Sequence, residues 1–176
     1  MTYAHGLIDS ESGARVVVGL DFYYLHKGDL WTSTHIVPEL ADNGTYVYVW
    51  TSGTTNHKHV SFNVTAGGDA FMSGYQSPTM AASGTAMSNF NRRRDGTNVT
   101  DVAIFNNGSI SGGTLTGTML FDLLLPGGRK SSAGGARGNS GGEWMVPASV
   151  GTFMLTVINQ AGATKPIGVE FNWYEE

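Results

Sequence analysis

Three consecutive arginines form the densest charge cluster in this chain. They lie in the segment Asn91–Asp95 and make up half of the six arginines in the sequence. A guanidinium group binds a carboxylate or phosphate through two parallel hydrogen bonds, so Arg92, Arg93 and Arg94 are candidates for gripping an anionic partner. The same residues could instead form a solvated turn whose aliphatic stems cover apolar neighbours.

A second basic group lies in a glycine-rich segment, residues 126–142. This segment holds seven glycines and three cations, and no apolar side chain larger than that of proline. A segment of this composition cannot build a core, and a loop of this length is usually functional or disordered. Its cations are Arg129, Lys130 and Arg137. Together with Arg92–Arg94 they could form one patch that contacts an acidic partner.

A nucleic-acid partner is less favoured for these cations. The formal net charge of the whole chain is −4, and no aromatic residues interleave the basic run as binding of single strands requires. Residues 91–140 hold six cations and three acids, so the basic region is a local feature of an acidic protein. We predict a protein partner and no nucleic acid.

Two histidines flank a lysine in His57-Lys-His59. This spacing can ligate a metal ion when a third ligand lies nearby. The closest acid in the sequence is Asp69, and no other ligand pattern surrounds the pair. We therefore expect exposed loop histidines, no metal site and no cofactor.

Motifs of known enzymes are absent. Gly108-Ser-Ile-Ser-Gly112 misplaces its serines relative to the Gly-x-Ser-x-Gly elbow. Residues 127–131 lack the leading glycine of a phosphate-binding loop. Without cysteine there is no thiol nucleophile, no disulfide and no thiolate zinc site. We predict that the chain is not an enzyme. The open alternative is a hydrolase whose catalytic carboxylates are distant in the sequence and are brought together only by the fold.

A row of aromatic residues alternates with valine in Thr45–Thr51. Tyr46, Tyr48 and Trp50 fall on one side of an extended strand and the valines between them on the other. Such a row could be a stacking platform for a sugar ligand. Packing in a sheet explains the same pattern, and we favour packing.

The elements that must position these residues read as strands. Short apolar stretches alternate with period 2 and are separated by Gly, Asn, Asp, Ser and Thr clusters, as in an antiparallel sheet with one buried face. The predicted strands are Arg15–Leu25, Trp31–Val37, Thr45–Thr51, His59–Thr65, Ala70–Tyr75, Val99–Phe105, Leu115–Leu125, Glu143–Pro147, Thr152–Asn159 and Gly168–Tyr174.

No stretch has a helical period. Pro78–Asn89 is rich in Ala, Ser and Met, but Gly84 interrupts it, so we predict a loop with short extended pieces. The predicted fold is all-β: a single antiparallel β-sandwich, jelly-roll-like, over residues 15–176. A short N-terminal arm, residues 1–14, precedes it, and the glycine-rich loop interrupts it.

Length and composition agree with one folded domain. The chain has 176 residues, charged residues are only 14%, and 11% are aromatic. These values argue against a disordered chain and a coiled coil. The N-terminus has no basic and apolar regions of a signal peptide, and no run approaches the ~18 apolar residues that span a membrane. We expect a soluble protein made without export, with no membrane contact.

An ordered set of segments runs along residues 30–176, without a catalytic signature. It consists of Trp31–Val37, Thr45–Thr51, Val60–Val64, Ala82–Ala86, Asn89–Arg93, Leu120–Leu125, residues 126–142, Glu143–Val146, Gly151–Asn159 and Phe171–Glu175. In this order the chain resembles the small β-sandwich structural proteins of tailed-bacteriophage virions, described as capsid decoration, cement or head-fibre-like proteins. The N-terminal arm lies outside the resemblance.

The resemblance implies a virion protein made in the host cytoplasm and placed on the capsid surface. It would bind the outside of an assembled capsid as a homo-oligomer, with a homotrimer expected, and brace neighbouring copies of the major capsid protein. The alternative is a receptor- or carbohydrate-binding module of a tail or head fibre, which an exposed platform at Tyr46, Tyr48 and Trp50 would favour.

Overall fold

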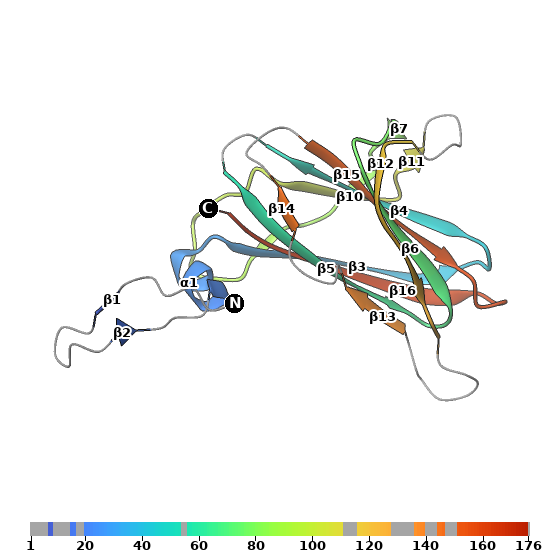
Figure 1. Ribbon diagram of the computed structural model, residues 1–176, viewed down its shortest axis with the longest axis horizontal. Coiled ribbons are helices and arrows are strands. Elements are labelled where there is room, and N and C mark those ends of the chain that lie inside the picture. Colours follow the sequence, from blue (N-terminus) through green and yellow to red (C-terminus); the bar gives the residue numbers. More distant parts are fainter. Residues whose placement is uncertain are drawn as a thin grey trace.

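Two large antiparallel sheets pack face to face in the computed structural model, which describes residues 7–8, 15–16, 20–53, 56–110, 116–127, 136–139, 144–146 and 151–175 (Figure 1). Sheet I has the order β12-β6-β15-β4-β10-β8. Its strands are Thr118–Leu125, Ala70–Gln76, Gly151–Asn159, Thr45–Ser52, Ala103–Asn106 and Thr85–Ala86. Sheet II has the order β13-β5-β16-β3-β9, and β14 also pairs with β5. These strands are Ala136–Asn139, Lys58–Ala66, Lys165–Glu175, Leu30–Leu40, Phe90–Asn91 and Trp144–Val146.

Eight of these strands wrap as a jelly roll. In chain order β3, β5, β14 and β16 belong to sheet II, and β4, β6, β12 and β15 belong to sheet I. The first four strands alternate between the two sheets. The last two strands then return to the middle of each sheet: β15 lies between β4 and β6, and β16 lies between β3 and β5. This is the double Greek key of that fold. The predicted all-β antiparallel sandwich is confirmed.

The core lies between the two sheets because the strands alternate as the sequence predicts. On β5 the inward residues are Val60, Phe62 and Val64, and opposite them in register are Trp173, Phe171 and Val169 of β16. Tyr48 and Trp50 of β4 face this core from sheet I. Burial of a large apolar side chain stabilises the fold by ~1.5–3 kcal/mol, so this layer supplies the main driving force.

The opposite face of β4 is buried as well. Val47 and Val49 form a second cluster with Tyr75 and Met154, and Met80 packs against it. Met80 comes from β7 (Met80–Ala82), which pairs with β11 (Ser109–Ile110) as a small separate sheet over this face. The predicted division of Thr45–Thr51 into two faces is confirmed.

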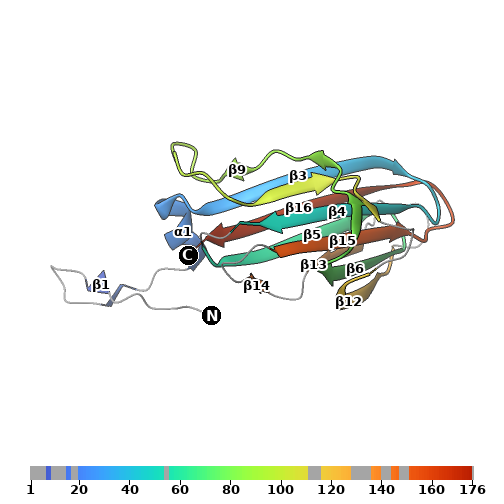
Figure 2. The ribbon, with the colours of Figure 1, turned by 90° about the horizontal axis from the view of Figure 1, so that it is seen from above.

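A long insertion between β6 and β12 closes one edge of the sandwich. Its strands β8 and β10 extend sheet I beside β4, and β9 extends sheet II beside β3 (Figure 2). The predicted short extended pieces in Pro78–Asn89 are present as β7 and β8. The strand predicted from Val99 begins only at Ala103, because the side chains of Thr100 and Asp101 bond to Glu175 and Lys58.

The prediction for Arg15–Leu25 is wrong over most of its length. Among its described residues, Arg15–Val16 form the strand β2, which pairs with β1 (Leu7–Ile8), and those from Leu20 onward belong to the helix α1 (Leu20–Lys27). Gly28 ends α1 with a positive φ of 85°, where its N–H and that of Asp29 donate to the Tyr24 carbonyl. A C-terminal glycine after a basic last turn is a helix signal, which the aromatic run obscured.

Part of the glycine-rich segment is also a strand. Ala136–Asn139 forms β13, paired with Asn63–Ala66 of β5, whereas the sequence predicted a loop over all of residues 126–142. Backbone hydrogen bonds along β5 make this pairing independent of apolar side chains. In the described part of the chain, no helix is long and apolar enough to cross a membrane.

Candidate functional site

The predicted arginine cluster forms a turn that packs against the end of α1. The backbone N–H of Arg92 donates to the Leu30 carbonyl at 2.9 Å, which fixes the start of the turn on β3. Arg93 Nη1 donates to the His26 carbonyl at 2.6 Å, and its Nε donates to Asp95 at 2.9 Å. The middle arginine is therefore a structural tie between the turn and the helix.

The ion pair within the turn keeps both of its groups charged. Hydrogen bonding and charge from Asp95 raise the pKa of Arg93, and Arg93 lowers the pKa of the Asp95 carboxyl. Because both side chains are exposed, we assign this pair little weight in stability. Its role is geometric, since it holds the turn in one shape.

Arg92 and Arg94 point outward from this fixed turn. Both side chains are exposed, and within the described residues neither has a hydrogen bond or an ion pair. Arg92 also borders a polar hollow of about 160 Å³ with His59, Asn172 and Tyr174. The turn therefore presents two free guanidinium groups at the end of the sandwich where α1 lies; we call this the arginine end.

Of the three other predicted cations, the structure describes the backbone of Arg137. Arg129 and Lys130 lie outside the described residues. The backbone of Arg137 is on β13, and β5, β16 and β3 separate it from β9. At ~4.8 Å per strand spacing that is roughly 19 Å, too far for one continuous patch of side chains within one copy. The candidate contact residues at the arginine end are Arg92 and Arg94.

The predicted aromatic row is largely internal. Tyr48 and Trp50 are 0% and 4% exposed and belong to the core, so they offer no open stacking face on the surface. Tyr46 is half-buried, and its hydroxyl donates to Asn106 at 3.1 Å. Burial raises the pKa of the Tyr48 hydroxyl well above its usual range. These contacts favour the packing interpretation.

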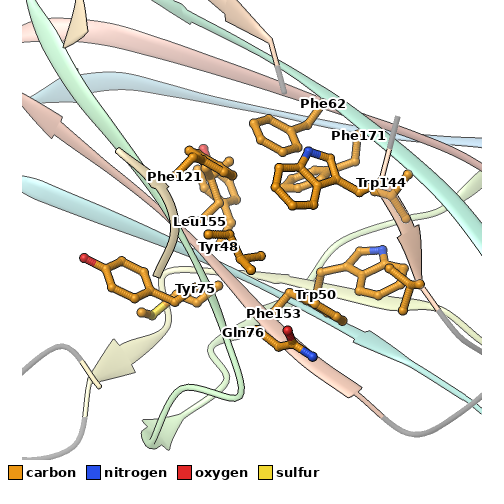
Figure 3. Close-up of a pocket in the computed structure, with 15 residues that line it drawn as sticks. Tyr48, Trp50, Phe62, Tyr75, Gln76, Phe121, Trp144, Phe153, Leu155 and Phe171 are labelled. Carbon is orange, nitrogen blue, oxygen red and sulfur yellow. The ribbon is translucent and has the colours of Figure 1, made fainter. Parts of the chain in front are cut away.

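An apolar cavity of about 190 Å³ lies between the sheets next to this row. Figure 3 shows Phe121, Trp144 and Phe153 around it, together with Tyr48 and Trp50. Phe121 lies directly over Gly74 of β6, where a Cβ atom would overlap the ring. The indole N–H of Trp50 is buried and has no hydrogen-bond partner among the residues that the structure describes. Two members of the aromatic row, Tyr48 and Trp50, thus line this cavity.

The two histidines of His57-Lys-His59 lie in different surroundings. His57 is exposed, and the His59 ring stacks on Tyr174 at 4.4 Å. Tyr174 in turn stacks on Tyr24 of α1 at 4.2 Å. Among the described residues, no group of three or more His, Cys, Asp or Glu side chains could hold a metal ion.

A buried charged cluster lies close by, and the sequence analysis missed it. Lys58 is fully buried, and its Nζ lies 2.8 Å from Oδ1 and 3.1 Å from Oδ2 of Asp101. Glu175 is 5% exposed and accepts a hydrogen bond from Thr100. The period-2 pattern of β5 was a usable signal, because it places Lys58 on the same inward face as Val60 and Phe62.

Comparisons with known proteins give little further information. No protein-family model matches the chain, and neither does any curated protein. Among solved structures, a mutant VP2 protein of infectious bursal disease virus in derived T=1 particles is 9% identical with a TM-score of 0.14. A structure of the Gt strain of that virus is 8% identical with a TM-score of 0.13.

Both comparisons cover nearly the whole of this chain, 98% and 99%. The chain spans a little under half the length of each of those proteins, 45% and 46%. Scores this low carry no argument about fold or function, so the assignment below depends on the geometry of this chain.

Proposed function

We propose that this protein is a non-catalytic structural component of a virion. It binds the outer surface of an assembled phage capsid as a homo-oligomer and stabilises or decorates that capsid. The observation that carries the proposal is the arginine end, where the turn presents the exposed side chains of Arg92 and Arg94, which have no hydrogen bond or ion pair with the described residues. Jelly rolls serve as viral capsid and lectin domains, and that analogy of fold supports the proposal without establishing it.

The matching surface on the major capsid protein is acidic. An exposed ion pair contributes only ~0.2–1 kcal/mol, so one arginine end binds weakly by itself. Several copies in one oligomer bind together, and the second and third contacts then gain from a high effective concentration. The proposal therefore requires both the free arginines and self-association.

The first test is the number of copies per purified virus particle, measured by quantitative mass spectrometry. Hundreds of copies support decoration of the capsid lattice. A handful would move the protein to a tail or vertex appendage and favour receptor binding. Absence from purified particles would overturn the proposal.

The second test is the variant Arg94→Ala. Its matched control is Lys165→Ala, because Lys165 begins β16 and the arginine end lies where β16 finishes. If each lost contact costs ~0.5 kcal/mol in each of three subunits, binding to capsids that lack the protein falls roughly tenfold. The control removes the same charge and leaves binding unchanged. Equal binding by the two variants in co-sedimentation would count against the arginine end as the contact surface.

Carbohydrate or receptor binding is the second candidate, and one observation favours it. The outer face of sheet II has an open depression of about 540 Å³ over Gly168, in which the exposed apolar side chain of Ile36 lies beside the polar residues Thr34, Asn63, Thr65 and Glu170. Asn63 donates to Glu170 at 3.1 Å, an arrangement that could also bind sugar hydroxyls. A glycan array probed with the purified protein tests it, and silence on the array together with no binding to host cells would remove this candidate.

A further inference from the structure

We propose that Lys58 and Asp101 form an intramolecular isopeptide bond, with Glu175 as the group that transfers protons in the reaction. This assignment goes beyond the proposed function and does not depend on it. Lys58 begins β5 in sheet II, and Asp101 precedes β10 of sheet I. The bond would therefore join the two sheets of the sandwich covalently.

The reacting groups are already in contact. The Lys58 amine lies 2.8 and 3.1 Å from the two carboxyl oxygens of Asp101, and its third neighbour is the Gly53 carbonyl at 3.3 Å. These contacts hold the amine nitrogen beside the carboxyl group, and such prior positioning lowers the barrier to reaction. The Lys58 amine is fully buried, so bulk water does not solvate it.

The carboxyl of Asp101 is held in place by its surroundings. It packs so closely on the α carbon of Gly53 that a Cβ atom there would overlap it. The preceding residue, Thr100, accepts a hydrogen bond from the Val102 backbone N–H at 3.1 Å, which fixes the loop. The Asp101 side chain is 24% exposed, so a released water molecule has a route to solvent.

Glu175 is positioned next to the lysine by strand register. In the antiparallel pair of β5 and β16, Glu175 is directly opposite Lys58, and both side chains are buried. Such cross-strand neighbours have Cβ atoms ~4.5–5.5 Å apart. Trp173 Nε1 donates to Glu175 at 3.4 Å, and Thr100 also donates to it. The carboxyl thus has a fixed orientation beside the amine.

Glu175 is suited to accept a proton and return it. Burial raises the pKa of its carboxyl, and the Asp101 charge raises it further, whereas the hydrogen bonds from Thr100 and Trp173 and the Lys58 charge oppose the rise. Condensation to an amide requires the neutral forms of both partners, a free amine and a carboxylic acid.

The reaction balances without any further reagent. The neutral Nζ of Lys58 attacks the carboxyl carbon of Asp101, and Glu175 accepts one proton from Nζ. Glu175 then donates that proton to the departing hydroxyl group. One N–C bond forms, one C–O bond breaks, one water molecule leaves, and Glu175 returns to its initial state.

Proximity can supply the driving force. Well-oriented groups in one molecule react as if present at about 10⁵–10⁸ M. This offsets the equilibrium in water between separate molecules, which favours the free amine and acid over the amide. The alternative is an ordinary buried ion pair, which gives the same contacts but no covalent bond. The two differ in the mass of the folded protein.

The test is intact mass spectrometry of the purified, folded chain, followed by peptide mapping. We expect a mass one water molecule below that of the sequence, and a cross-linked peptide pair containing Lys58 and Asp101. Trypsin should fail to cleave after Lys58. A folded wild-type chain at the full sequence mass would overturn the proposal.

Two variants make the test specific. Glu175→Gln keeps the side-chain shape but not the proton transfer, and we expect the full sequence mass and restored cleavage after Lys58. Glu170→Gln, on the outer face of the same strand, should lose water like the wild type. Circular dichroism of both variants would check that they are folded. Two outcomes would contradict the assignment. One is that the loss of water maps to the Asp95–Gly96 sequence, and the other is that Glu175→Gln loses water to the same extent as the wild type.

Discussion

The aromatic residues around His35 determine the orientation and the pKa of this side chain. His35 faces inward from β3, stacks with Tyr46 at 5.7 Å and has its Nδ1 3.2 Å from the Tyr48 hydroxyl. Burial lowers the pKa of the His35 imidazole below 6.5. The folded state therefore binds this proton less readily than the unfolded chain does.

Stability should consequently fall on the acid side of pH 6.5. Below that pH the unfolded state binds more protons, so the contribution of neutral His35 is complete above it and is lost as pH falls through the lower folded pKa. Measured by urea unfolding at about pH 8 and about pH 5, the free energy of unfolding should fall less for His35→Gln than for wild type. His57→Gln, at an exposed site, should lose as much as wild type. An equal loss of unfolding free energy in all three proteins would refute this prediction.

At the scale of elements, α1 is held by one aromatic stack. Tyr24 is 4% exposed, and Tyr174 lies between its ring and that of His59. An eight-residue helix is too short to be stable alone in water, so docking on the end of sheet II must supply its stability. The same helix end receives Arg93, which couples α1 to the arginine end.

Tyr24→Ala should therefore destabilise the protein by about 3 kcal/mol, the range for a buried aromatic side chain. The midpoint of thermal unfolding should fall by roughly 6–12 °C. Val99→Ala, at a site that is 87% exposed, should change the midpoint little. If the tyrosine variant keeps the wild-type midpoint, the stack does not hold α1.

At the scale of the whole molecule, the two edges of sheet I differ. The insertion covers one edge, whereas β12 is an edge strand with Met119, Leu123 and Leu124 40–58% exposed. Phe71 of the adjacent β6 adds a further exposed ring. A long edge strand with exposed apolar side chains favours pairing with another chain. This edge is where we expect self-association.

Light scattering of the purified protein should report three copies, the homotrimer that the resemblance implies. Leu124→Lys places a charge on the β12 edge and should shift the mass to that of one copy. Val99→Lys places the same charge at another exposed apolar site and should leave the oligomer intact. A wild-type chain that stays monomeric at micromolar concentration would exclude the expected homotrimer.

The fold class and most of the strands could be predicted from the amino-acid sequence. Alternation of apolar and polar residues is a local property with period 2, so the two faces of Thr45–Thr51 and the inward residues of β5 could be predicted from neighbours in the chain. In the described part of the chain, the prediction that no stretch is helical is wrong at α1, where packing of Tyr24 overrides the strand preference of an aromatic run.

Tertiary structure alone decided which polar residues meet. Lys58, Asp101 and Glu175 come from two sheets and from distant parts of the chain, and only strand register places Glu175 opposite Lys58. The same holds for Arg93, which reaches the end of α1 through the β3–β9 pairing. Period-2 alternation and residue propensity are local properties, whereas strand register and sheet order are not. For that reason the buried charged cluster and the separation of Arg137 from the arginine end emerged only from the folded chain.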